Sequence, residues 1–391
     1  MNTAYLVAPV RTAGGKRKGR LAGWHPADLG AAVLNAIADR SGIDPASIDD
    51  VIMGCVTQGG EQTFAFGRNC VLASKFPQTV PAVTIDRQCG SSQQAIQFAA
   101  QAVMSGTQDM VIAAGVESMT RVPMGSNFNL YQQAGIGVGP FAPSIQQRYG
   151  VKEFSQFQGA QMIAEKYGFS REDLDRFALE SHKRAVRATE EGAFKDEIIP
   201  LTVDKPEGGT ELHVRDEGIR YDASLESMAS LEPILEGGVI TAGNASQMCD
   251  AASGVLVVNE HALKAHNLTP MARIVNMTVT AGDPVIMLEE PVNATRRALE
   301  RAGMSIGDID LYEVNEAFAP IPLMWLQGVG ADPAKMNVNG GAIALGHPLG
   351  ASGTKLMATL IHALRARGKR YGLQTMCEGG GLANVTIVEA L

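Results

Sequence analysis

The sequence places two cysteines and one histidine in settings typical of catalytic loops. Cys89 follows a run of β-forming residues and precedes a segment with helical spacing, so its thiol is expected at a helix N-terminus. His347 lies within the glycine-rich residues 337–353, and three glycines follow Cys377. Glycine lets the backbone approach a ligand closely because it has no Cβ. These segments predict a site built from loops, with a nucleophilic thiol and nearby backbone N–H groups.

Each of these residues also has a purely structural interpretation. Free N–H groups at a helix start favour a thiolate, which predicts a nucleophile at Cys89, although a buried packing cysteine fits the same position. Glycine and proline beside His347 indicate an exposed turn rather than a core histidine. Cys377 ends an apolar strand, where burial is the simple explanation, but the glycines after it predict N–H groups that converge on an oxyanion. Asn315 ends another apolar strand and could orient water or an oxyanion, or simply make a turn.

Composition excludes several classes of function. The chain has 391 residues, 45% of them hydrophobic and 19% charged, which is typical of a globular enzyme with two or three domains. A net charge of −8 argues against a nucleic-acid partner, and no apolar run reaches the roughly 18 residues of a membrane span. The five cysteines lack Cys-x-x-Cys spacing, which favours reduced thiols and a cytoplasmic location over zinc or disulfides.

An internal repeat indicates how these residues are positioned. Residues 38–53 resemble residues 299–314: in each, a helix ends near a glycine, a short loop follows and a strand begins. Strand and helix patterns alternate after both segments, which predicts two copies of one α/β domain. We predict an N-terminal domain of residues 1–118 plus 250–270, an inserted loop domain of residues 119–249 that covers the site, and a C-terminal domain of residues 271–391.

Taken together, the motifs resemble those of the thiolase family over essentially the whole chain. Four segments carry most of the resemblance: Cys-Gly-Ser-Ser at 89–92, Asn-Glu-Ala-Phe at 315–318, the Gly-His-Pro segment at 337–348 and Cys-x-Gly-Gly-Gly at 377–381. Residues 11–13, 115–119 and 241–246 add to it. The resemblance implies duplicated α/β domains in a layered α-β-α-β-α arrangement, with an inserted loop domain.

The resemblance also implies an acyltransferase that cleaves 3-oxoacyl-CoA with CoA, or runs the reverse Claisen condensation, through an acyl-cysteine. Cys89 would be the nucleophile, His347 would accept its proton, and Cys377 would move the α-proton in either direction. His347 and a water held by Asn315 would stabilise the enolate oxygen. The backbone N–H groups of Cys89 and Gly379 would form the oxyanion hole for the tetrahedral intermediate.

In this family, acyl-CoA and CoA are substrates, and the resemblance implies neither a cofactor nor a metal. Arg220 matches the basic contact near the adenine end of CoA, and Ser246 matches the contact to the pantetheine arm. Both also fit solvated loop positions. The family forms dimers and tetramers, so a homodimer or homotetramer is expected.

Several positions depart from the family pattern. Glu378 stands where the family usually has an apolar residue, and an ionised carboxylate there would raise the pKa of Cys377 by like-charge repulsion. Ala383, Gln247 and Ala251 replace glycines. These changes cluster where the acyl chain and the pantetheine are expected, which favours a bulkier substrate from fatty acid or steroid degradation.

Three alternatives remain open at this point. Within the same chemistry, the chain could be an acetyl-CoA acetyltransferase that forms acetoacetyl-CoA. An inactive CoA-binding scaffold would have lost a reactive group, whereas all four are retained here (Cys89, Asn315, His347, Cys377). A redox or peptide-cleaving cysteine enzyme predicts a resolving thiol or a histidine oriented by a carboxamide.

Overall fold

Within residues 2–391, which the computed structural model describes, eleven strands form one mixed sheet. Met1, the first residue of the predicted N-terminal domain, lies outside the described residues. Two further strands, β7 and β8, pair with each other only. The strands are β1 (Tyr5–Thr12), β2 (Gly15–Lys16), β3 (Asp50–Gly54), β4 (Ala82–Ile85), β5 (Met110–Ser118), β6 (Ile198–Ile199), β7 (Leu201–Asp204), β8 (Thr210–His213), β9 (Cys249–Val258), β10 (Ala272–Ala281), β11 (Leu311–Val314), β12 (Tyr371–Glu378) and β13 (Leu382–Ala390).

The large sheet consists of two halves with the same strand order. The first half runs β3-β5-β9-β1 and the second runs β11-β12-β13-β10, with equivalent strands in the same sequence order. Strand β4 extends the first half beside β3, whereas the matching segment of the second half makes only a bridge between Met336 and Tyr312. The halves join through β1 and β10, where Leu6 pairs with Ala272. This topology confirms the predicted duplication.

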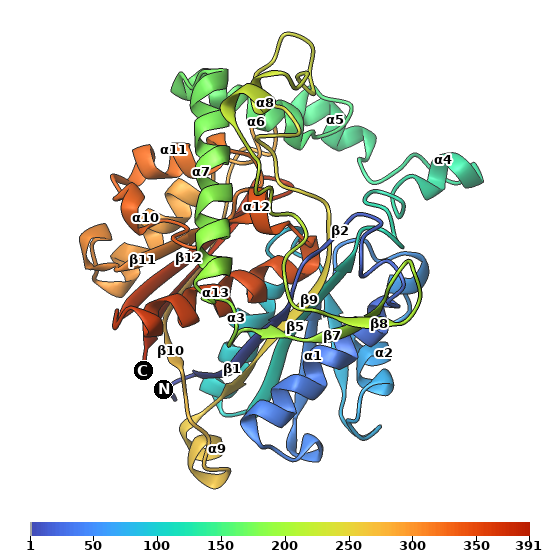
Figure 1. Cartoon of the computed structure of the whole chain (residues 1–391), viewed down its shortest axis with the longest axis vertical. Helices are drawn as coiled ribbons and strands as arrows, with labels where there is room; N and C mark the ends of the chain where they lie inside the picture. Colours follow the sequence, from blue (N-terminus) through green and yellow to red (C-terminus); the bar gives the residue numbers. More distant parts are fainter. Residues whose placement is uncertain (1) are drawn as a thin grey trace.

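Helices cover both faces of the two half-sheets (Figure 1). Helices α3 and α13 pack against each other between the halves, and α1, α2, α10 and α11 cover the outer faces. The predicted five-layer α-β-α-β-α arrangement is therefore confirmed. The helices are α1 (Pro26–Ser41), α2 (Phe66–Ala73), α3 (Ser91–Ser105), α4 (Leu130–Ala134), α5 (Pro143–Tyr149), α6 (Gln156–Tyr167), α7 (Arg171–Glu190), α8 (Leu225–Ala229), α9 (Glu260–Ala265), α10 (Pro291–Ala302), α11 (Pro320–Val329), α12 (Ala342–Leu345) and α13 (Ser352–Ala366).

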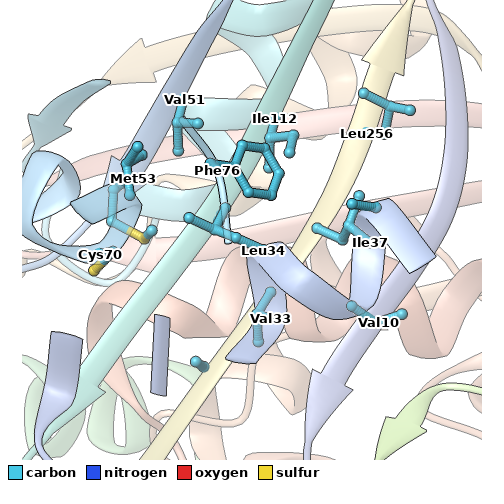
Figure 2. Packing of buried hydrophobic residues seen from close by; sticks show 14 of the residues in the cluster. Val10, Val33, Leu34, Ile37, Val51, Met53, Cys70, Phe76, Ile112 and Leu256 are labelled. Carbon is cyan, nitrogen blue, oxygen red and sulfur yellow. The ribbon is translucent and has the colours of Figure 1, made fainter. Parts of the chain in front are cut away.

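The core of the first half shows why these segments fold as they do (Figure 2). Apolar residues of α1 such as Leu34 and Ile37 recur at helical spacing and are fully buried. They pack on Ile112 of β5 and Leu256 of β9, two strands that are buried along their whole length. Strands covered on both faces read as continuous apolar runs, which is the pattern of residues 110–116.

The helix ends follow their predicted signals. Gly42 and Gly303 cap α1 and α10 with φ of +72° and +65°, a left-handed conformation that suits glycine. Helix α7 begins after Ser170, whose hydroxyl and the Asp173 carboxylate form a reciprocal capping box. The polypeptide then turns through Gly192, where the sequence predicts the end of this helix.

The long segment between β5 and β9 leaves the large sheet and returns to it. Strands β5 and β9 pair directly, with Ser118 opposite Asp250, although residues 119–248 separate them in the sequence. Within this segment, α6 packs on α11, and α7 packs on α12 and α8. Figure 1 shows α7 running across the layered body while α4 and α5 project away from it. The predicted insertion is therefore present, and its outer boundaries remain a prediction.

Candidate active site

Cys89 lies in the short loop between β4 and α3, as its sequence position predicts. The residue before it, Gln88, has a φ of +48°, which is uncommon for a residue with a side chain and is typical of constrained functional loops. Cys89 is half-buried, and α3 begins two residues later at Ser91. The thiol packs against an apolar cluster formed by Val56, Met119 and Leu349. Leu349 comes from the second half, so Cys89 lies where the two halves meet.

The prediction that Cys89 is a thiolate is wrong. Burial, followed by the negative charge of Glu378, raises the pKa of Cys89 to about 12. These effects exceed the help that the start of α3 gives to a thiolate. At neutral pH, Cys89 is therefore a thiol, and it needs a partner that removes its proton during attack.

His347 has one ring nitrogen fixed by hydrogen bonds. The Ser352 hydroxyl lies 2.6 Å from Nδ1 of His347 and 2.9 Å from the carbonyl oxygen of Pro348. Because the hydroxyl has a single proton, donation to the carbonyl leaves it as the acceptor for an Nδ1–H group. Nε2 of His347 then carries the ring's lone pair, towards which the side-chain amide of Asn315 donates at 3.4 Å. In this tautomer, Nε2 is the ring nitrogen that can accept a proton.

The electrostatic surroundings keep the imidazole neutral. Burial, followed by the positive charge of Lys355, lowers the pKa of His347 to about 3. The Lys355 ammonium is itself buried and donates to the backbone carbonyls of Leu345 and Gly346, at 2.6 and 2.9 Å. Lys355 therefore anchors the turn that carries His347 and also disfavours a second proton on the ring. Without substrate, the thiol of Cys89 and the imidazole of His347 are therefore both neutral.

Two glycines allow the segment after His347 to approach α3 and the end of β3. A Cβ at Gly353, in the first turn of α13, would lie 2.7 Å from Cα of Gln93 in α3. A Cβ at Gly350 would lie 2.6 Å from Cα of Cys55. Real Cβ atoms are not found at such distances from backbone atoms, so these contacts require glycine. The glycine-rich segment thus serves close helix packing as well as the turn itself.

Cys377 enters the same site from the end of β12. The residue is buried, and the three-residue turn of Gly379, Gly380 and Gly381 follows its neighbour and leads into β13. Burial, followed by the charges of Cys89 and Glu378, raises the pKa of Cys377 well above its usual range. The two sulfurs are therefore electrostatic neighbours, although one thiol belongs to each half of the molecule.

Gly379 and Asn315 lie at the edges of this cluster. The Gln88 side chain lies against Gly379, so the turn after β12 contacts the Cys89 loop. Asn315 follows β11 directly, and its backbone N–H bonds to Thr375 of β12. Its side-chain oxygen has no hydrogen-bond partner among residues 2–391. Cys89, Cys377 and Gly379 thus lie together at the interface of the two halves. His347 and Asn315 form a second pair, and Leu349, two residues after His347, packs near Cys89.

Comparison with known proteins agrees with this arrangement. Family models described as the N-terminal and C-terminal thiolase domains match residues 4–261 and 268–390. The chain belongs to the thiolase family. A steroid 3-ketoacyl-CoA thiolase of Mycobacterium tuberculosis is 53% identical, over 100% of this chain and 95% of the relative. A 3-ketoacyl-CoA thiolase of Bacillus subtilis is 39% identical over the full length of both proteins.

The thiolase fold is equally clear in a solved structure. The crystal structure of the acetyl-CoA acetyltransferase of Bacillus anthracis superimposes with a TM-score of 0.91 and 35% identity. The match covers 100% of this chain and 99% of that one. The enzyme class, acyltransferase, follows from the family.

The two residues predicted to bind CoA differ in their distance from the candidate site of this thiolase. Arg220 is exposed and borders a groove with Lys183 and Arg187, while its backbone N–H donates to His182. Ser246 is half-buried, and its backbone N–H donates to the Ala317 carbonyl. The structure therefore places Ser246 beside the Asn-Glu-Ala-Phe segment and Arg220 at the surface.

Gln247, a departure from the family pattern, connects these segments. Its side-chain amide donates to the carbonyls of Gly218 and Ile343, both at 2.7 Å. The backbone carbonyl of Gln247 accepts the backbone N–H of His347 at 2.9 Å. Gln247 therefore holds the loop that leads to Arg220 against the turn that carries His347.

Sequence reasoning missed three supporting residues. Ser352 fixes the His347 tautomer, and Lys355 anchors the same turn. Glu316 accepts hydrogen bonds from Ser181, Asn337 and the Ile343 N–H, which ties β11 to the glycine-rich segment and to α7. Glu316 could have been found, because it follows Asn315 directly in an apolar context. Lys355 gave no signal, because a lysine on a helix is normally solvated.

Proposed function

We propose that this thiolase cleaves 3-oxoacyl-CoA esters with CoA, giving acetyl-CoA and a shortened acyl-CoA through an acyl-Cys89 intermediate. Two observations support the proposal: the thiols of Cys89 and Cys377 are neighbours between the halves of the sheet, and the turn that carries the neutral imidazole of His347 reaches the same interface through Leu349. A redox pair would not need the imidazole, and a peptide-cleaving site would not need the second thiol.

The first stage forms the acyl-enzyme. Nε2 of His347 takes the Cys89 proton while the sulfur attacks the 3-oxo carbon of the substrate. The bond between the second and third carbons then breaks, and Cys377 gives its proton to the departing acetyl-CoA carbanion. The N–H groups of Cys89 and Gly379 stabilise the tetrahedral oxyanion, and His347 with an Asn315-bound water stabilises the enolate oxygen.

The second stage transfers the acyl group to CoA. The CoA thiol gives its proton to the Cys377 thiolate and attacks the acyl carbon on Cys89. The Cys89 sulfur leaves and recovers a proton from His347, so each group returns to its starting state. The same steps in reverse give the Claisen condensation, because a thiol can act as acid or base.

We propose that CoA extends from Ser246 towards Arg220. Lys183 and Arg187 lie beside Arg220 in the same groove. These local positive charges would attract the phosphates of CoA despite the net charge of −8. Gln247 supports this path, because it connects the loop before Arg220 to the catalytic turn.

Two measurements test this function. Incubation with acetyl-CoA followed by mass spectrometry of Cys89-containing peptides should show an acetyl adduct, and a protein without such an adduct is not a thiolase of this mechanism. A panel of 3-oxoacyl-CoA esters of different length and branching, followed by CoA-dependent loss of the enolate absorbance, then identifies the acyl chain.

We propose that the preferred substrate is bulkier than acetoacetyl-CoA. The 53% identity with a relative named as a steroid 3-ketoacyl-CoA thiolase supports this, as do the changes in the predicted acyl and pantetheine pocket. The second candidate is an acetyl-CoA acetyltransferase, which is the name of the Bacillus anthracis neighbour. Activity on acetoacetyl-CoA alone, with longer esters inert, selects the second candidate.

We also propose a homodimer or homotetramer in the cytoplasm. The five cysteines are free thiols in the structure, which supports a reducing compartment. None of the helices within residues 2–391 combines the length and apolar character needed to cross a bilayer. Light scattering of the purified protein gives the number of subunits directly.

A further inference from the structure

Glu378 is a buried acid beside both reactive sulfurs that the steps above do not use. It follows Cys377 at the end of β12, so the two side chains point to opposite faces of the strand. Glu378 is fully buried, and within residues 2–391 neither of its carboxyl oxygens has a hydrogen-bond partner. Buried carboxyl groups are normally hydrogen-bonded, so this exception needs an explanation.

The carboxyl group lies at the start of α3. A Cβ on Gly90, the residue between Cys89 and α3, would lie 2.6 Å from Cδ of Glu378. On the same side, the amide of Asn384 donates to the Gly90 carbonyl at 3.3 Å. Glu378 therefore lies beside Gly90, the residue that joins Cys89 to α3, close enough for its charge to act on a Cys89 thiolate.

We propose that Glu378 is a positioning residue that keeps Cys89 in its thiol form until His347 accepts the proton. The inference rests on the proposed function, because it gives Cys89 and His347 their roles in acyl transfer. The carboxyl acts on the nucleophile through space and touches neither the substrate nor the transferred proton.

Charge repulsion is the physical basis of this role. A carboxylate and a thiolate at one buried helix start repel each other, so the ionisation of either group disfavours the other. The other groups that face Glu378 are Asp86 and Arg87, from the loop after β4, and Cys377 on its own strand. Burial raises the pKa of Glu378 well above its usual range, whereas Arg87 and the backbone N–H of Asn384 favour the carboxylate and Asp86 opposes it. The repulsion therefore acts in the alkaline range, in which both the carboxyl and the thiol titrate.

The role predicts how the thiol behaves without substrate. A neutral thiol is a weak nucleophile, so Cys89 resists alkylation and oxidation until a bound carbonyl makes proton transfer to His347 productive. The apolar residue usual in the family at this position would leave the start of α3 available to the thiolate. Glu378 would therefore protect the nucleophile of this chain more strongly.

The test is the pH dependence of Cys89 alkylation by iodoacetamide, read by peptide mass spectrometry so that Cys377 is scored separately. In Glu378→Gln, which keeps the size of the side chain, the midpoint should fall by about one pH unit. At alkaline pH, where the wild-type carboxyl is ionised, alkylation should become about tenfold faster. A midpoint equal to that of the wild type, or higher, overturns the proposal.

Glu313→Gln is the matched control. Glu313 is also buried, has an oxygen without a partner within residues 2–391, and lies on the adjacent strand β11. Its charge does not contribute to the pKa shift of Cys89. The control should keep the wild-type midpoint, and an equal shift in both variants also overturns the proposal.

A second variant and a separate activity measurement keep the outcomes distinguishable. Glu378→Leu removes the charge in case glutamine is poorly tolerated, and it should show the same lowered midpoint. Acetyl-CoA adduct formation in the wild type tests the proposed function by itself. A wild type without the adduct refutes the function, whereas normal adduct formation with an unchanged Glu378→Gln midpoint refutes only the role of Glu378.

Discussion

Two buried carboxyl groups near the carboxyl ends of equivalent strands, Glu117 in β5 and Glu378 in β12, have opposite surroundings. Glu117 accepts the N–H groups of Val56, Thr57 and Gly350 and the side-chain amide of Gln62, at 2.8 to 3.0 Å. Neither oxygen of Glu378 has a hydrogen-bond partner in the described part of the chain. Both residues are fully buried, but they differ in hydrogen-bond donors and in charged neighbours, since Arg87 and Asp86 act on Glu378.

The difference shows that equivalent positions in the two halves of a duplicated fold can have different roles. In the first half, Glu117 holds the end of β5 against residues 56–57 by hydrogen bonds. It also accepts the N–H of Gly350, which binds the turn that carries His347 to the first half. In the second half, the strand ends carry Asn315 and Cys377, and the carboxyl beside them is left to act by its charge. Both carboxyls raise the pKa of Cys89, Glu378 more than Glu117, but only Glu117 also holds the fold together through hydrogen bonds.

The largest expected effect is the loss of turnover when either thiol is removed, and the acyl adduct distinguishes the two variants. Cys89→Ala should lower turnover by about 10⁴-fold and abolish the acyl adduct, because the nucleophile is lost. Cys377→Ala should lower turnover by about 10³-fold but still acquire an acetyl group from acetyl-CoA, because it removes only the acid and base. Turnover rates and intact mass report these results. Adduct formation by Cys89→Ala would contradict this division of roles.

The next effect concerns the burial of His347 in the second half. Its pKa in the folded protein, about 3, lies below the ordinary value of 6.5, so between these values the unfolded chain binds a proton that the folded chain does not. The stability due to the neutral ring is complete above pH 6.5 and declines as the pH falls, by about 1.4 kcal/mol per pH unit.

Urea unfolding of the wild type and of His347→Gln between pH 7 and pH 4 checks this linkage. The difference in unfolding free energy between the two proteins should shift by about 3 kcal/mol against the wild type as the pH falls. A difference independent of pH would mean that the folded protein accommodates the protonated ring.

A smaller effect tests the two carboxyls directly. Glu117→Gln should lower the free energy of unfolding by about 2 kcal/mol, because the new amide points a donor at backbone N–H groups and leaves them unsatisfied. Glu378→Gln should leave the free energy of unfolding unchanged or raise it, because no donor loses its acceptor. Urea titration at pH 7 measures both, and equal losses would remove the distinction between the two sites.

The smallest effect concerns the support of the imidazole. Ser352→Ala removes the acceptor for Nδ1–H of His347, so the ring no longer prefers the tautomer with a free Nε2. We expect kcat to fall about tenfold with little change in KM, since the hydroxyl faces away from the substrate side. Ser352→Thr keeps the hydroxyl and should recover most of the activity. A rise in KM at constant kcat would assign Ser352 to binding instead.

The fold was largely predictable because its signals are local. Each of these signals depends on a few neighbouring residues. Examples are the C-cap glycines Gly42 and Gly303, the N-cap Ser170 and the apolar run at 110–115. The candidate reactive residues could also be proposed from the sequence, because the combination of thiol, imidazole and glycine-rich turns is rare. The support of the site was not predictable, since Ser352 and Lys355 act on groups whose neighbourhood depends on how the helices pack.

The sequence by itself determined the repeat, the reactive groups and the thiolase resemblance, because these depend on residue types and short spacings. Only the tertiary structure decided the protonation of those groups. A helix start alone predicts a thiolate at Cys89, but burial and Glu378, almost 300 positions away in the sequence, reverse that preference. Acidity depends on all charges and solvent around a group, and these are fixed only when both halves pack together.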